Sequence, residues 1–252
     1  MSSFKHKRYY IYLYTIAIVT LIFGMNDSVA DKIYSPNTEY REISLEYNGS
    51  QSFDSNPDKD DAQQNEISLE AGISPRLEME FSSAYSKEPG KSNHLDGHEI
   101  EGRYQFFEPG EKWLDSGILV AYGISSQSER PNSLEVKLLL QKDTGWFTST
   151  ANIGFTNNIG KHSKNTGGPD YEFLFNTRYR YNINFQPGLE LQSNLGQGHQ
   201  LGNLNKQEHQ IGPAVYGKVF GHFEYQAAYL FGVSDAAAQG IARLLVEYEL
   251  DY

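Results

Sequence analysis

The stretch ARLLVEYELDY, residues 242–252, decides the fold. Its apolar and aromatic residues recur at every second position, as Leu244, Val246, Tyr248, Leu250 and Tyr252. The residues between them include Arg243, Glu247, Glu249 and Asp251. A period of two gives a β-strand one apolar face and one polar face. Chain ends are usually frayed and polar, so this ending predicts a strand with a partner on each edge and a different environment on each face.

The same alternation recurs from Arg41 onward, for example in REISLEYNG (41–49), LEVKLLLQ (134–141) and FEYQAAYLFGV (223–233), and it predicts about twelve strands with no comparable helix. Short and long connections follow one another in turn. The short ones are Ser74–Arg76, Pro109–Trp113, Asp143–Gly145, Ile183–Pro187 and Gly221–His222. The long ones are Ser50–Gln64, Lys87–Asp96, Ser126–Ser133, Asn157–Pro169, Gly196–Lys206 and Ser234–Gln239. This pattern predicts an all-β fold, a transmembrane antiparallel up-and-down β-barrel with short periplasmic turns and longer extracellular loops.

The first thirty residues have the order of a secretory signal peptide. A basic start at Lys5, Lys7 and Arg8 precedes the apolar run Tyr9–Gly24, and small residues lead up to Ala30. The run is shorter than the roughly 20 residues of a spanning helix, which argues against an uncleaved anchor. We therefore expect a signal peptide over 1–30, a periplasmic N-terminal segment over 31–40 and an outer-membrane barrel over 41–252.

Charge and cysteine content exclude two classes of protein. The full chain has a net charge of -11, and the chain from Asp31 onward, with 18 basic and 31 acidic residues, has a net charge of -13. Nucleic-acid binding requires basic patches, so no nucleic-acid partner is expected. The chain has no cysteine, so an exported form would fold without disulfides.

A soluble β-sandwich or a lipocalin-like barrel would also show short alternating strands. Aromatic residues distinguish the alternatives, because they gather at the short turns as the aromatic girdle of a membrane interface does. These residues are Trp113, Trp146, Phe147, Tyr181, Phe185, Phe220, Phe223 and Tyr252. A twelve-stranded soluble barrel would in addition have a wide interior to fill. The membrane barrel is the favoured interpretation.

If the apolar face meets lipid, the polar face lines the lumen, with fourteen glutamates, Glu46 and Glu70 among them, and six basic residues. The lumen-lining set on which we focus is Glu78, Glu80, Glu99, Glu101, Arg103, Glu135, Lys137, Glu172, Arg178, Arg180, Glu190, Glu224, Arg243 and Glu247. Charges in a lumen need water or partners. Two outcomes stay open, namely a narrow wet pore that prefers cations, and a barrel closed by interlocking Glu–Arg pairs.

Residues that resemble catalytic or metal-binding groups lack the required spacing. His162 and Ser163 are adjacent in a predicted loop and would point apart, whereas a hydrolytic pair needs one strand face. His199 and His209 show no ligand spacing on one element. The acidic run Ser55–Asp61 reads as a solvated loop. We therefore predict no catalytic residues, no metal site and no cofactor.

Two resemblances narrow the class. The final strand, Leu244 to Tyr252, resembles the signal by which the barrel assembly machinery recognises bacterial outer-membrane proteins. The hairpins LEAGISPRLEMEFSSAYS (69–86) and YNINFQPGLELQSNLG (181–196) resemble those of the outer-membrane family named for the meta-cleavage pathway of phenol degradation. That resemblance implies a transporter or channel and supplies no catalytic residues.

Together these features predict an outer-membrane channel of a Gram-negative bacterium. It would pass small polar or aromatic solutes passively through a narrow acidic lumen, and it would not be an enzyme. Its expected partners are outer-membrane lipid, the barrel assembly machinery and the solutes. The alternative is a closed structural or interaction barrel that presents extracellular loops, and an outer-membrane hydrolase comes third.

Overall fold

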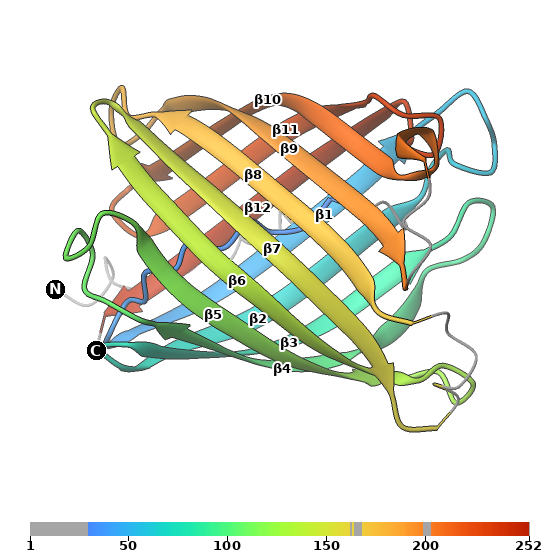
Figure 1. The fold of residues 1–252 in the computed structure, drawn as a ribbon, viewed down its shortest axis with the longest axis horizontal. Helices are drawn as coiled ribbons and strands as arrows, with labels where there is room; N and C mark the ends of the chain where they lie inside the picture. The colour runs from blue at the N-terminus through green and yellow to red at the C-terminus, as the bar shows by residue number, and fades with distance from the viewer. Residues whose placement is uncertain (1–29, 162, 164–167, 199–202, 252) are drawn as a thin grey trace, which may run out of the picture.

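The protein is described by a computed structural model that covers residues 30–161, 163, 168–198 and 203–251. It is a closed barrel of twelve antiparallel strands, each paired with its neighbours in the sequence, and β1 closes onto β12 (Figure 1). The strands are β1 Glu42–Phe53, β2 Gln63–Ser74, β3 Leu77–Lys87, β4 His94–Gln105, β5 Asp115–Ser125, β6 Asn132–Thr144, β7 Phe147–Ile159, β8 Asp170–Tyr179, β9 Gln186–Gln197, β10 Glu208–Val219, β11 Phe223–Gly232 and β12 Gly240–Asp251. No helix among the described residues is long and apolar enough to cross a membrane.

The terminal strand does have a partner on each edge. On one side β12 pairs with β1 along its whole length, from Glu42 opposite Asp251 to Phe53 opposite Gly240. On the other side it pairs with β11 from Phe223 to Phe231. Closure leaves no strand edge with unpaired backbone groups. The predicted fold class is confirmed.

The two faces of the strands differ as the period of two requires. On β6 the outward Leu138 is 40% exposed, whereas its neighbour Leu139 is fully buried inside the barrel. Large apolar side chains are exposed on the outer faces of the other strands too, including Leu69, Phe81, Ile100, Ile153, Leu189, Tyr229 and Phe231. The barrel therefore carries an apolar belt outside and most of its buried charged groups inside.

The two ends of the barrel differ. One end carries tight connections such as the two-residue turn at Gly145 and Trp146, where a positive φ at Gly145 alone suits a type II′ hairpin. Exposed aromatics gather at this short-turn end, among them Trp113, Trp146, Tyr181, Phe185 and Phe220. One predicted short turn is longer than expected, because the β4–β5 connection runs over 106–114. Its backbone is tied by a hydrogen bond from Phe106 N to Ser116 O of 2.9 Å.

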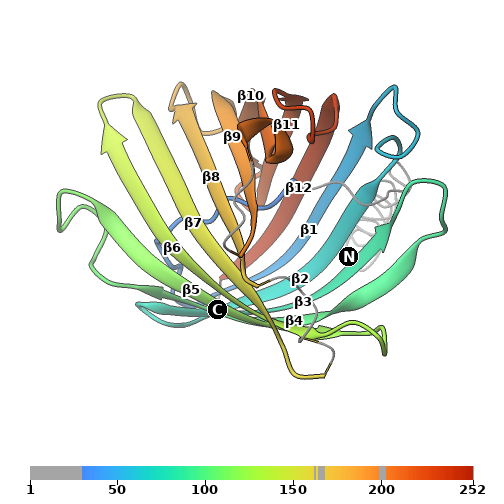
Figure 2. The ribbon, with the colours of Figure 1, turned by 45° about the vertical axis from the view of Figure 1, so that its right-hand side comes forward.

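Most of the segment 30–41 lies inside the barrel, where the sequence predicts a periplasmic segment over 31–40, and within it Glu39, Tyr40 and Arg41 are exposed. It appears as the blue coil that crosses the interior in Figures 1 and 2. Ala30 packs among Ala214, Tyr216, Ala228, Leu230 and Ile241. Tyr34 packs against Leu119, Ala121 and Leu139 of β5 and β6. These buried inward apolar residues form an inner surface that the segment covers.

Candidate functional site

Three carboxylates on neighbouring strands surround one ammonium group inside the barrel. Glu46 of β1, Glu70 of β2 and Glu80 of β3 face inward, and one oxygen of each lies within 4.8 Å of the others. Lys32 of the N-terminal segment reaches all three, with Nζ 2.9 Å from Glu46, 3.6 Å from Glu80 and hydrogen-bonded to Glu70. All four side chains are buried or nearly so. We call Glu46, Glu70 and Glu80 the carboxylate cage.

The backbone of the segment is held by side chains of the barrel wall. The side-chain amide of Asn152 on β7 accepts a hydrogen bond from Tyr34 N and donates one to Tyr34 O, both at 2.8 Å. Arg103 of β4 donates to Ser35 O at 3.0 Å. Gln105 accepts from Thr38 N at 2.9 Å. Polar groups without a partner are costly when buried, so these bonds fix the path of the segment through the lumen.

The ring of Tyr34 lies at the centre of several cations. The Nζ atoms of Lys32 and Lys137 lie 4.9 and 5.4 Å from the ring centroid, and the Arg103 guanidinium lies at 5.8 Å. A cation within about 6 Å of an aromatic face is attracted by the ring quadrupole. Tyr34 therefore joins the segment to two basic residues of the wall, from β4 and β6.

The basic residues of the wall are paired with carboxylates. Arg103 hydrogen-bonds to Glu78 and lies 3.6 Å from Glu70. Lys137 lies 3.0 Å from Glu172 and 3.3 Å from Glu135. Such pairs offset the cost of taking charges out of water.

A second network fills the opposite wall around Glu190 of β9. Arg243 of β12 donates to Glu190 Oε2 at 2.7 Å, and both side chains are fully buried. Tyr216 donates to the same oxygen at 3.2 Å, and Gln192 donates to Oε1 at 2.7 Å. Arg178 lies over the Tyr216 ring at 5.8 Å. This carboxylate is thus fully engaged by protein groups.

A cavity of about 400 Å³ lies between the N-terminal segment and the long loops. The segment lines it with Asp31, Lys32 and Tyr34, and the wall with polar residues that include Glu66, His98, Glu99, Glu135 and Lys137. Arg130 contributes from the β5–β6 loop and also contacts Glu88 of the β3–β4 loop. A hydrogen bond from Lys91 lowers the pKa of Glu88, which keeps this loop carboxylate ionised.

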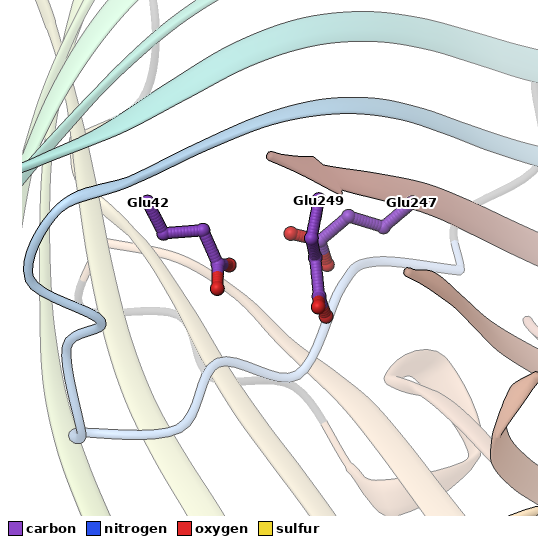
Figure 3. A group of neighbouring side chains, drawn as sticks. All are labelled: Glu42, Glu247 and Glu249. Atoms are coloured by element: carbon purple, nitrogen blue, oxygen red, sulfur yellow. The ribbon is translucent and has the colours of Figure 1, made fainter. Parts of the chain in front are cut away.

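At the short-turn end, Glu42 of β1 and Glu247 and Glu249 of β12 bring three carboxylates within 4.8 Å of one another (Figure 3). Lys218 of β10 hydrogen-bonds to Glu249 and lies 3.5 Å from Glu224. Lys218 supplies a cation of the protein itself beside these carboxylates, so we assign this cluster no ligand. It extends the acidic character of the inner wall toward this end.

Most residues of the sequence-predicted lumen set lie on inner faces of the strands. Glu78, Glu80, Glu101, Lys137, Glu190 and Arg243 are buried. Glu99, Arg103, Glu135, Glu172, Arg178 and Glu247 are half-buried. Glu224 is half-buried beside Lys218 near the short-turn end.

Arg180 is the exception, because β8 ends at Tyr179. Its guanidinium pairs with Asp143 and donates to Gly145 O at 2.5 Å in the β6–β7 turn. Arg180 therefore belongs to the rim of the barrel and not to the lumen wall.

Other predicted residues have simple places. Leu244, Val246, Tyr248 and Leu250 alternate with the buried Arg243, Leu245 and Glu249 along β12. Ser163 donates to Gly160 O at 2.9 Å in the β7–β8 loop, and His209 bonds to Ser193 at 2.9 Å. His162, His199, Tyr252 and the stretch 1–29 lie outside the described residues.

Sequence reasoning missed the contribution of Lys32 and Tyr34, which belong to an irregular segment without a period. One signal was present. Leu138, Leu139 and Leu140 form an uninterrupted apolar run, and so do Leu244, Leu245 and Val246. An apolar residue on an inner face needs a cover, and the N-terminal segment covers Leu139.

No protein-family model matches the chain, and no curated protein matches it in sequence. The resemblance to the phenol-pathway family therefore stays a prediction. The fold is that of an outer-membrane β-barrel of the porin-like, twelve-stranded kind, as three solved structures indicate.

An outer-membrane channel from Pseudomonas putida F1 superposes with a TM-score of 0.62 at 10% identity, over 88% of this chain and 100% of the channel. The KdgM porin in complex with disordered oligogalacturonate gives 0.55 at 11% identity, over 82% of this chain and 98% of the porin. The NanC porin gives 0.54 at 11% identity, over 82% and 100%.

Proposed function

We propose that the chain is an outer-membrane channel for small polar solutes with a preference for cations. The observation that carries the proposal is the contrast between the two faces of the closed barrel. Outside lies an apolar belt with aromatics at one end, which suits lipid. Inside, ionisable side chains line a cavity of about 400 Å³. Charged groups of this density need water or a polar solute beside them.

The sign of the inner charge sets the preferred class of solute. Carboxylates outnumber cations in the lining of the cavity, with Asp31, Glu66, Asp96, Glu99 and Glu135 against Lys32, Arg130 and Lys137. A low-dielectric wall focuses the excess, so cations become enriched and anions depleted. The oligogalacturonate bound by the KdgM porin is a polyanion. The acidic wall argues against that solute class for this chain.

The placement of the N-terminal segment favours a second candidate, a closed barrel whose loops interact with partners. The segment lies in the lumen and is held by Asn152, Arg103 and the carboxylate cage. If the segment never leaves the lumen, it blocks the passage of solutes through the barrel. The final strand serves in both cases as the proposed signal for the barrel assembly machinery.

Planar-bilayer conductance separates the two candidates. The refolded chain Asp31–Tyr252 is compared with a chain that begins at Arg41 and so lacks the segment. A channel conducts in both forms, with larger or longer openings in the shortened chain. A closed barrel conducts only when shortened. Absence of current from both chains, in bilayers where refolding is verified, would reject the channel.

Reversal potentials in a salt gradient then test selectivity. We expect a cation preference that weakens as the Debye length falls from about 10 Å at 0.1 M to about 3 Å at 1 M salt. Replacing Glu78, Glu80, Glu99 and Glu101 together by Gln should also weaken it, because these residues share adjacent strands β3 and β4. Arg103 already neutralises part of this wall. Anion selectivity of the unmodified chain would contradict the proposal.

A further inference from the structure

We infer that the carboxylate cage is a binding site for a primary ammonium group, and that Lys32 is a tethered occupant with which small ammonium solutes compete. The inference deepens the proposed function, since it names a solute class for the channel. Glu46, Glu70 and Glu80 come from three consecutive strands and converge within 4.8 Å. The chain places its own ammonium at the centre of them.

The cage offers an ammonium as many carboxylates as it has N–H donors. An alkylammonium has three N–H donors, and three separate carboxylates face Lys32 Nζ. Among the residues that the structure describes, Lys32 is the one cation within 4 Å of the carboxylates of Glu46 and Glu80. The Glu46 Oε1 atom is buried and accepts no hydrogen bond from the described residues. The cage thus depends on a cation that the wall itself does not supply.

Arg103 reduces the excess negative charge of the cage. Its guanidinium lies 3.6 Å from Glu70 and therefore adds a fixed positive charge beside the cage. That charge offsets part of the negative charge of the three carboxylates, so a single positive charge such as an ammonium neutralises a larger share of what remains. The same guanidinium donates to Ser35 O, in the segment that carries Lys32.

The site is placed for exchange with solutes. Lys32 lines the cavity of about 400 Å³ between the segment and the long loops. Glu46, Glu70 and Glu80 are not among the residues that line the cavity, so an ammonium solute in it reaches their carboxylates once the Lys32 side chain moves aside. Displacement of Lys32 removes ionic contacts that hold the segment in the lumen, so binding favours the open form. A tethered competitor acts at a local concentration in the millimolar range, so displacement requires solute of that order.

Chemical rescue tests the site. The substitution Lys32→Ala removes the Cγ, Cδ, Cε and Nζ atoms, which together correspond to n-propylammonium. We expect propylammonium chloride to raise the unfolding midpoint of this variant in detergent above that in sodium chloride of equal ionic strength, and to saturate. At ten times its Kd, a ligand that binds only the folded state multiplies the folding constant about 11-fold. Tetramethylammonium, which has no N–H donor, should give no more than sodium.

Two further variants complete the design. Lys32→Ala combined with Glu46→Gln and Glu80→Gln leaves Glu70 with Arg103 and removes the uncompensated carboxylates, so it should fold and ignore propylammonium. Lys59→Ala truncates a loop lysine that donates to Asp235 O at 2.6 Å, and it should not respond either.

An equal response to propylammonium and tetramethylammonium, or rescue of the triple variant, would overturn the inference. So would failure of Lys32→Ala to fold at every propylammonium concentration while the triple variant folds. The assay requires no conduction, so a barrel that is rescued but carries no current retains the site and loses the channel.

Discussion

Replacement of Asn152 by Ala should release the N-terminal segment from the lumen without unfolding the barrel. The Asn152 side chain is fully buried and makes two hydrogen bonds with the backbone of Tyr34, both 2.8 Å long. Each such bond stabilises by about 1 kcal/mol net. The loss of both weakens docking by about 2 kcal/mol, which raises the ratio of released to docked segment about 30-fold. The unpaired backbone groups of Tyr34 would add to this effect.

Thiol labelling measures the release. The chain has no cysteine, so Ile33→Cys introduces a single thiol at a buried position of the segment. If the segment leaves and re-enters the lumen faster than the thiol reacts with the reagent, the labelling rate is proportional to the population of the released form. The labelling rate of the Ile33→Cys barrel is compared with that of the same barrel carrying Asn152→Ala. Electrophoresis of unheated samples verifies that both barrels remain folded under the labelling conditions.

Thr156→Val is the matched control, because Thr156 lies on the same strand and donates to Glu135 at 3.0 Å instead of to the segment. It should leave the labelling rate within a factor of a few of the parent. Equal rates for the Asn152→Ala and parent barrels would refute the reasoning, because the two hydrogen bonds would then not hold the segment. Equal acceleration by both substitutions would show general loosening of the wall instead.

Three other expectations concern the rest of the chain. Intact mass of protein taken from outer membranes should begin at Asp31, and a mass that retains residues 1–30 would contradict processing. Leu138→Arg should cost about 2–4 kcal/mol of unfolding free energy if Leu138 faces the bilayer midplane. Asn194→Arg, which places the new charge on the inner face opposite Glu172, should cost less, and equal costs in a lipid-refolding titration would reject the face assignment. Arg243→Met should lower the free energy of unfolding by about 3–5 kcal/mol, because it leaves the buried Glu190 carboxylate uncompensated. The double variant Arg243→Met with Glu190→Gln should recover much of this loss, and urea unfolding of the two variants makes the comparison.

The strand framework could be predicted because the alternation of residues along a strand shows which side chains face each of its two environments. Leu138 and Val136 point outward while Lys137 and Leu139 point inward, as alternation requires. Turn residues such as Gly145 then fix where each hairpin reverses. The limit of this reasoning lies at strand ends, where the period stops. Alternation places Arg180 on the inner face of β8, but β8 ends one residue earlier, at Tyr179. The position of Arg180 beside Asp143 depends on the neighbouring β6–β7 turn.

The interior could be predicted only in part, because its key contacts join distant residues. Tyr34 and Asn152 are 118 positions apart. The segment that carries Tyr34 contains Pro36 and has no repeating pattern, so nothing local indicates that it enters the lumen. The acidic wall was visible in the sequence, whereas the cation that joins three of its carboxylates was not. Only the inward Leu139 and Leu245 indicated that part of the wall needs a cover.

The chemistry of the interior bears on the choice between channel and closed barrel. A barrel that serves only as a scaffold gains nothing from buried ion pairs, because well-packed apolar residues of similar volume are often as stabilising or more so. This chain does use apolar packing where the segment covers Leu119 and Leu139. Elsewhere it keeps carboxylates whose cations come partly from the N-terminal segment. With the N-terminal segment in the lumen, Lys32 compensates these carboxylates, and without the segment they are left with an excess negative charge. A wall of this kind is suited to passing a cation, which favours the channel over the closed barrel.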